Sequence, residues 1–86
     1  MMRVDIIFTP EQVELVKQGA KELGVKLRDN FNGPNFYEVL TWGFLPDGQW
    51  VFLKVPPNEG GKGTATYYYP AKDISRVSVY QENEND

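Results

Sequence analysis

The chain has 86 residues, of which 41% are hydrophobic and 14% aromatic, and it contains neither cysteine nor histidine. This length fits one small domain with a single hydrophobic core. Without cysteine and histidine, the chain lacks disulfide bonds, thiolate metal sites and histidine-based catalysis, which excludes most catalytic schemes. We therefore expect a protein that is not an enzyme and that holds no metal and no cofactor.

The formal charge of −3 comes entirely from the C-terminal residues. Residues 81–86 contain three acidic residues and no basic one, which leaves nine residues of each sign in residues 1–80. A neutral body lacks the basic surface of a protein that binds duplex nucleic acid. Because residues 81–86 also have no apolar side chain to bury, we predict one globular domain over 1–80 and a flexible acidic tail over 81–86.

The hydropathy pattern predicts no contact with a membrane. No stretch approaches the ~20 apolar residues that a membrane-spanning helix needs. The first residues contain one arginine and only a short apolar stretch, unlike a secretory signal peptide. We therefore expect a cytoplasmic protein.

The N-terminal residues predict a strand followed by a helix. Residues 3–8 alternate between apolar and polar well enough for a half-buried strand. Thr9 is then expected to be the N-cap of a helix, with Pro10 at the first helical position. Gln12, three residues after the cap, would complete a capping box.

The helix is expected to be amphipathic and to end at Gly24 in a left-handed conformation. Its apolar stripe is formed by Val13, Val16, Ala20 and Leu23, and is widened by Leu15 and Gly19. Gly19 suggests either a close approach between the helix and a sheet or a tolerated glycine, since glycine costs about 1 kcal/mol in a helix. Residues 25–28 then predict a short strand, and residues 29–35 a loop.

Residues 36–55 predict a long β-hairpin around which the rest of the chain is organised. Pro46 suits the position of a tight turn that requires a fixed negative φ, and Gly48 suits the position that requires a left-handed φ. A three-residue loop that pairs Leu45 with Gln49 would set the register of the two strands. That register pairs Phe44 with Trp50, Trp42 with Phe52, Leu40 with Lys54, Gly43 with Val51, Thr41 with Leu53 and Val39 with Val55.

Both faces of such a hairpin are apolar, one aromatic and one aliphatic, whereas an antiparallel hairpin commonly has one polar face. The helix or the first strand is expected to cover the aliphatic face. The aromatic face would then be either the core or a contact surface for another molecule.

Residues 56–63 are expected to be a flexible connection rich in glycine. They contain Lys62, but the loop lacks the glycine and lysine spacing of a phosphate-binding P-loop and precedes a strand. A strand with three consecutive tyrosines is predicted at 64–69, a short helical turn at 70–73 and a last strand at 74–80.

Together these elements predict an α+β domain with five or six strands and one amphipathic helix near the N-terminus. The strands are expected to form a mostly antiparallel, strongly bent sheet or a partly open small barrel. The order of elements is similar to that of Sm-like and SH3-like small barrels. An open sheet with the helix on one face is the alternative.

Eight residues are candidates for binding, because aromatic patches occur at protein interfaces and cations bind anionic groups. They are Trp42, Phe44, Trp50, Phe52, Tyr67, Tyr68, Lys62 and Arg76. We expect a non-enzymatic binding module that contacts a protein partner or a second copy of itself. In its size, lack of cysteine and acidic tail, the chain resembles small regulators and inhibitors encoded by phages and mobile elements.

Two other functions use the same residues. An oligomer could bind a nucleotide or a nucleotide-derived signal by stacking on tyrosine, with Lys62 or Arg76 on the phosphate. A small barrel could instead bind single-stranded nucleic acid on its aromatic residues. The carboxylates of Asp5, Glu38 and Asp73 are expected to face solvent or to cap turns rather than to act in acid–base catalysis.

Overall fold

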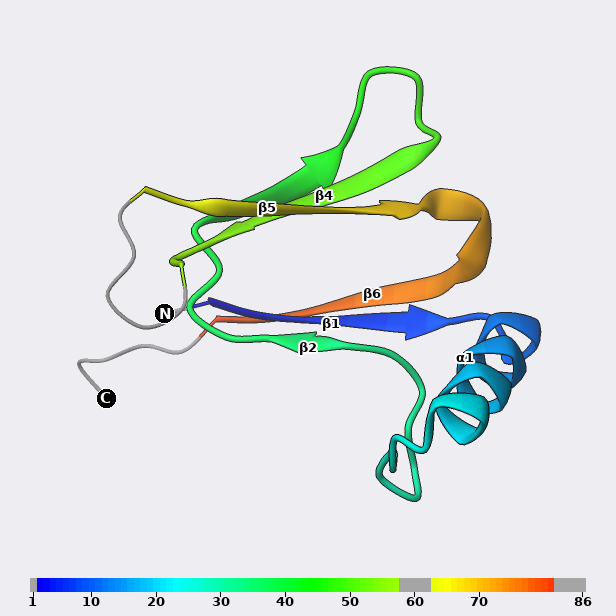
Figure 1. Cartoon of the computed structure of the whole chain (residues 1–86). Helices are drawn as coiled ribbons and strands as arrows, with labels where there is room; N and C mark the ends of the chain where they lie inside the picture. The colour runs from blue at the N-terminus through cyan, green and yellow to red at the C-terminus, as the bar shows by residue number, and fades with distance from the viewer. Residues whose placement is uncertain (1, 58–62, 82–86) are drawn as a thin grey trace.

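The computed structural model shows two three-stranded antiparallel sheets that pack face to face (Figure 1). The structure describes residues 2–57 and 63–81. Within these residues the elements, in chain order, are β1 (Met2–Phe8), α1 (Pro10–Leu23), β2 (Asn35–Phe36), β3 (Thr41–Phe44), β4 (Trp50–Val55), β5 (Ala65–Pro70), the 3₁₀ helix η1 (Ala71–Asp73) and β6 (Ile74–Gln81).

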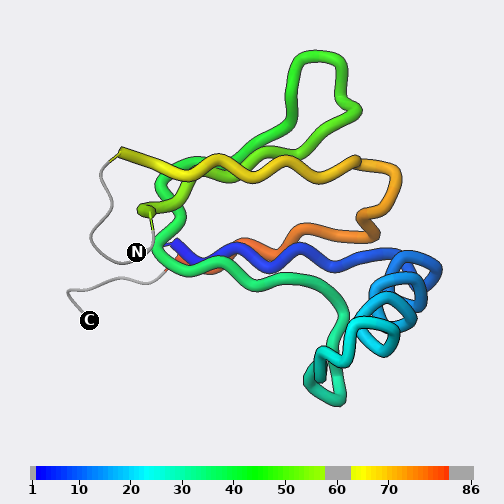
Figure 2. Tube along the Cα trace, in the orientation of Figure 1, coloured from blue at the N-terminus to red at the C-terminus, as the bar shows by residue number. Residues whose placement is uncertain are grey.

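One sheet has the strand order β2-β1-β6 and the other has the order β3-β4-β5. The chain passes between the sheets twice, after β2 and again at η1 (Figure 2). At the first crossing, the Val39 N–H donates to the Met2 carbonyl of β1, whereas the N–H of Leu40 donates to Lys54 of β4, each at 2.8 Å. Two consecutive residues therefore bind to different sheets.

The α+β class, the N-terminal helix and the antiparallel strands are confirmed. The prediction of a strongly bent sheet or a partly open barrel is wrong, because neither sheet is closed or strongly curled. At both connections the chain moves from one sheet to the other, so the hydrogen-bonded ladder of a single sheet does not continue. In the described part of the chain, no strand pairing joins the two sheets.

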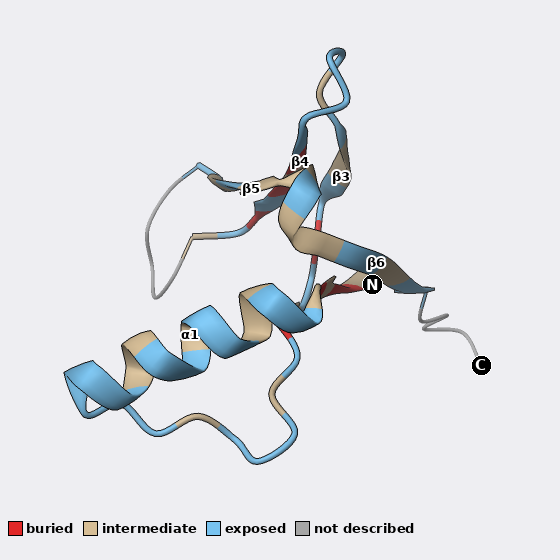
Figure 3. Ribbon diagram, turned by 90° about the vertical axis from the view of Figure 1, so that its right-hand side faces the viewer, coloured by how far each residue is buried: buried red, intermediate tan, exposed pale blue. Residues whose placement is uncertain are grey.

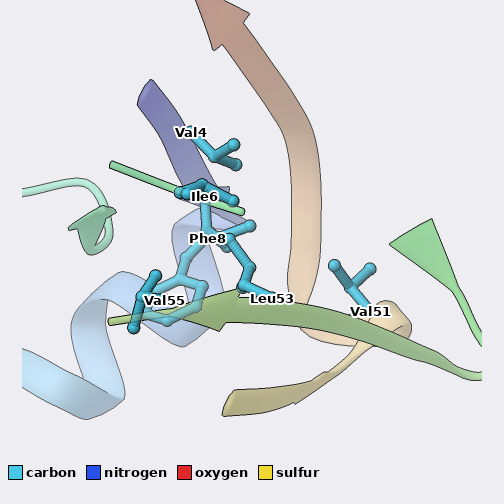
Figure 4. Packing of buried hydrophobic residues seen from close by; sticks show 7 residues of the cluster. Val4, Ile6, Phe8, Val51, Leu53 and Val55 are labelled. Carbon is cyan, nitrogen blue, oxygen red and sulfur yellow. The ribbon is translucent and has the colours of Figure 1, made fainter. Parts of the chain in front are cut away.

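The core lies between the sheets and comes mainly from β1 and β4. Alternate side chains of these strands point toward one another (Figure 4). The buried apolar residues are Val4, Ile6, Phe8, Val39, Val51, Leu53 and Val55. The aliphatic face of β4 is thus covered by the first strand, which was one of the two expected covers, and not by the helix.

Aromatic rings close the core at its margins. Tyr69 of β5 lies 6.0 Å from Phe8 and 6.1 Å from Phe36, measured between ring centroids, and Tyr67 lies 5.3 Å from Phe36. These contacts join β5 of one sheet to β1 and β2 of the other. Burial raises the pKa of the Tyr69 hydroxyl above its ordinary value.

The helix begins and ends where the sequence predicts. Thr9 Oγ1 accepts a hydrogen bond from the N–H of Gln12 at 3.2 Å, and Gly24 at the other end has a φ of 73°. A full capping box would also have the Gln12 side chain accept from the N–H of Thr9. That N–H instead donates to the carbonyl of Asp73 at 2.9 Å. This bond ties the start of α1 to η1.

The helix contributes little to the core. Val13 and Val16 contact it, but no residue of α1 is buried, and Leu15 is 63% exposed (Figure 3). A Cβ on Gly19 would meet no atom within 4 Å, so the close helix–sheet approach is wrong and Gly19 is a tolerated glycine.

The short strand expected at residues 25–28 is also wrong. The edge of β1 that it could have paired with is taken by the residues before β2. Ile6 N–H donates to the carbonyl of Pro34 at 3.0 Å, and Phe8 N–H donates to that of Asn32 at 2.8 Å. A strand edge offers one row of donors and acceptors, so residues 25–28 remain irregular.

Candidate functional site

The hairpin has a register that differs by one residue from the expected one. Phe44 pairs with Val51, and the N–H of Leu45 donates to the carbonyl of Trp50 at 2.9 Å. The loop therefore has four residues, 46–49, instead of three. The expected pairing of Leu45 with Gln49 fails because the N–H of Gln49 donates to Asp47 Oδ1 at 2.9 Å, which keeps Gln49 in the turn.

This shift of one residue divides the aromatic set between two faces, because neighbouring residues of a strand point in opposite directions. Trp42 now pairs with the buried Leu53, so the expectation that both tryptophans share a face is wrong. The structure places the candidate aromatic residues in two groups: Trp42, Phe44 and Tyr67 on the inner side of β3-β4-β5, and Trp50, Phe52 and Tyr68 on its outer side.

We call Trp50, Phe52 and Tyr68 the outer aromatic face. Trp50 is 39% exposed and Tyr68 is 55% exposed. Phe52 pairs with Tyr68 on one side and Gly43 on the other, and its ring lies over Gly43, where a Cβ would be 3.2 Å from Phe52 Cε1. Among the described residues, no helix or strand covers this face, since α1 lies on the far side of the molecule (Figures 1 and 3).

In the inner group, Trp42 is the residue that packs against the core. Trp42 contacts the core and lies 6.3 Å from Phe44 between ring centroids. Phe44 and Tyr67 are 55% and 40% exposed and do not belong to the set of residues that pack against the core. Trp42 therefore has a packing role, and Trp50 is the tryptophan that faces solvent.

The outer side of the other sheet is polar. Arg3 donates to both oxygens of Asp5, with Nε–Oδ1 and Nη2–Oδ2 distances of 3.0 and 2.7 Å. The Arg3 guanidinium also lies 4.9 Å from the Tyr80 ring centroid and 5.6 Å from that of Tyr37. Asp5 is only 6% exposed, so the expectation that it faces solvent is wrong.

Protonation of Asp5 should cost stability at low pH. The hydrogen bonds from Arg3 hold the pKa of Asp5 below its ordinary value, against the opposing effect of burial. A carboxylate of this kind stabilises the fold above its unfolded-state pKa of about 4, and this contribution is lost as the pH falls through its lower folded-state pKa.

Urea unfolding at a series of pH values would measure this contribution. Asp5→Asn should be less stable than the wild type at pH 7, and the difference should shrink as the pH falls below about 4. The control Glu14→Gln changes an exposed acid on α1 and should keep the wild-type pH dependence. An unchanged pH dependence in Asp5→Asn would contradict this role.

Arg28 reaches the same side from the loop after α1. Its Nη1 donates to Asn35 Oδ1 at 2.6 Å, and its Nη2 donates to the carbonyl of Gly33 at 3.0 Å. Together with Arg76 and Ser78 of β6, it lines a depression of about 340 Å³ over this sheet. The alternation of residues 3–8 predicts that Arg3 and Asp5 share a face, which is confirmed, but no sequence pattern places Arg28 beside them.

The residues expected to capture a nucleotide are not brought together. Arg76 lies on the outer side of β2-β1-β6, whereas Tyr67 and Tyr68 belong to the other sheet. Lys62 lies outside the described residues, as do residues 82–86 of the expected tail. Gln81, expected to start that tail, is the last residue of β6 and pairs with Met2.

Comparisons of the chain with protein-family models, curated proteins and solved structures give no match. Within residues 2–57 and 63–81, no helix has the length and apolar character needed to cross a membrane. The fold and site define a small two-sheet α+β protein with an aromatic face on one sheet and a polar face on the other.

Proposed function

We propose that this chain is a non-enzymatic binding module that acts through protein–protein contact at the outer aromatic face. The observation that supports the proposal is the uncovered position of Trp50, Phe52 and Tyr68 on one side of β3-β4-β5. Tryptophan and tyrosine are enriched among the residues that dominate binding energy at interfaces. A rigid sheet presents these rings at a low entropic cost of binding.

The charge of this face favours a different protein over a second copy. The three strands have four, six and six residues and lie about 4.8 Å apart, so this face covers only a few hundred Å², less than the ~800 Å² per partner of a standard stable interface. A contact with either kind of partner would therefore be weak or extend beyond this face. Lys54 is the charged residue on this side of β4, so two copies would bring two lysines and no carboxylate into one contact. The partner should have an apolar surface flanked by carboxylates.

A small regulator or inhibitor can act by covering the surface of another protein, and this mode of action needs no catalytic group. Base stacking on the same rings is less favoured, because binding of single-stranded nucleic acid combines aromatic residues with a positively charged groove. The outer aromatic face has Lys54 beside it but no arginine.

Replacement of the two tryptophans should have opposite consequences. Trp50→Ala should leave the free energy of unfolding within about 1 kcal/mol of the wild type and weaken association by about 2 kcal/mol or more. Trp42→Ala is the matched variant and should lower the free energy of unfolding by about 2–4 kcal/mol, because its ring contacts the core.

Native mass spectrometry of the protein purified from its host would identify a retained partner, which is then titrated with each purified variant. Chemical denaturation would measure the stability of the same variants. A partner that binds Trp50→Ala as tightly as the wild type would contradict the proposal. If the wild type is a homo-oligomer and Trp50→Ala dissociates it, the partner at this face is a second copy of the chain and not a different protein.

A further inference from the structure

The polar depression over β2-β1-β6 has an excess of positive charge. It is lined by three arginines, Arg3, Arg28 and Arg76, and by one carboxylate, that of Asp5. Asp5 forms an ion pair with Arg3 at 2.7 Å and therefore neutralises that guanidinium. Among the described residues, neither Arg28 nor Arg76 forms an ion pair with a carboxylate.

The structure holds one of these two cations in place. Arg28 donates to the side-chain oxygen of Asn35 and to the carbonyl of Gly33. Both acceptors are neutral, so the bonds orient the guanidinium without cancelling its charge. Arginine has five N–H donors in a fork that matches phosphate oxygens. In these two bonds Arg28 uses one N–H of Nη1 and one of Nη2. Among residues 2–57 and 63–81, the remaining donors of Arg28 have no acceptor and could bind an anion.

Polar and aromatic groups surround the two cations. Ser78 lies between Arg76 and Tyr80 on the same side of β6, opposite Asp5 of β1. Asn30 and Asn32 add amide groups from the loop before β2. The Tyr80 ring stacks on Arg3 yet stays about half exposed, which leaves an aromatic surface for a ligand ring.

We propose that this depression binds the phosphate group of a small phosphate monoester, with Arg28 and Arg76 on the phosphate oxygens and Tyr80 beside the organic part. A phosphate monoester carries a charge near −2 at pH 7, which matches the net excess of positive charge that three arginines and one carboxylate give the depression. A volume of about 340 Å³ is at the small end of ligand sites, where a nucleoside monophosphate fits better than a polymer. The site is on the other sheet from the outer aromatic face and does not depend on the function proposed above.

Titration of the full chain with the four nucleoside 5′-monophosphates, followed by amide NMR, would test this site. At least one should shift the resonances of Arg76, Ser78 and Tyr80 and bind about tenfold or more tightly than its unphosphorylated nucleoside. Inorganic phosphate should shift the same resonances at higher concentration, because it makes the charged contacts alone.

Arg76→Gln should weaken binding of the monophosphate by about tenfold or more. Its control, Lys72→Gln, removes an exposed positive charge on η1 outside the depression and should change the affinity by less than about twofold. Circular dichroism would check that both variants fold. The resonances that shift in the wild-type titration test the site without relying on either variant.

Several results would overturn the proposal. One is the absence of shifts at β6 with all four monophosphates at millimolar concentration. Another is an equal affinity for a nucleoside and its monophosphate, or an equal effect of Arg76→Gln and Lys72→Gln. Affinity that rises steeply with the length of a single-stranded oligonucleotide would assign the arginines to a polymer backbone instead.

Discussion

Gly33→Ala should lower the free energy of unfolding by more than about 4 kcal/mol, a large part of the ~5–10 kcal/mol expected for a domain of this size. Gly33 is buried against β1 and has a φ of 145°, which residues with a side chain rarely adopt. An added Cβ would overlap the carbonyl oxygen of Ile6 and lie 3.3 Å from the backbone nitrogen of Phe8.

Relief of this overlap requires the backbone to move, because both neighbours are main-chain atoms. The movement would break the bonds from Ile6 to Pro34 and from Phe8 to Asn32. It would also shift the Gly33 carbonyl that accepts from Arg28. Gly33→Ala therefore affects both the β2 edge and the polar depression.

Urea denaturation followed by circular dichroism would measure the loss. The control is Gly19→Ala, since Gly19 has open space around it and lies within α1. This control should keep the stability or raise it by up to about 1 kcal/mol. A Gly33→Ala variant as stable as the wild type would show that residues 32–34 do not lie against β1.

Leu53→Ala should lower the free energy of unfolding by about 3–5 kcal/mol. Leu53 is 0% exposed and lies on β4, where it pairs with Trp42 and Tyr67 on either side. Truncation would leave a cavity between the two sheets that the paired strands cannot close without losing their hydrogen bonds. The loss includes both the transfer of apolar surface and the cavity itself.

Leu15→Ala provides a control with the same change of side chain. Leu15 is on the exposed side of α1, so its truncation should change the free energy of unfolding by no more than about 1 kcal/mol. Thermal and urea unfolding of the two variants in parallel would measure the difference. Equal losses would mean that α1 packs on a sheet and that the core extends beyond β1 and β4.

Local chemistry determined the helix and most of the strands from the sequence alone. Thr9, Pro10 and Gly24 mark the ends of α1, because a capping hydroxyl, a missing N–H and a left-handed φ act within one turn. The alternation in β1 and β6 likewise indicates strands, since the side-chain period of a strand is local. In β4, the aromatic and β-branched residues favour a strand instead. The class of the fold follows from these elements.

Only the tertiary structure decided which side of each strand is buried and which residues meet. The four-residue loop is held by the bond from Gln49 to Asp47 and by backbone bonds of Leu45 and Gly48, and its difference of one residue from the expected loop moves Trp50 and Trp42 to opposite faces. The helix stripe was one of the two expected covers for the hairpin, but Val4, Ile6 and Phe8 of β1 are the residues that pack against β4. Arg28 meets Asn35 and the Gly33 carbonyl because residues 32–34 lie along β1, and a contact of this kind depends on chain packing rather than on local sequence pattern.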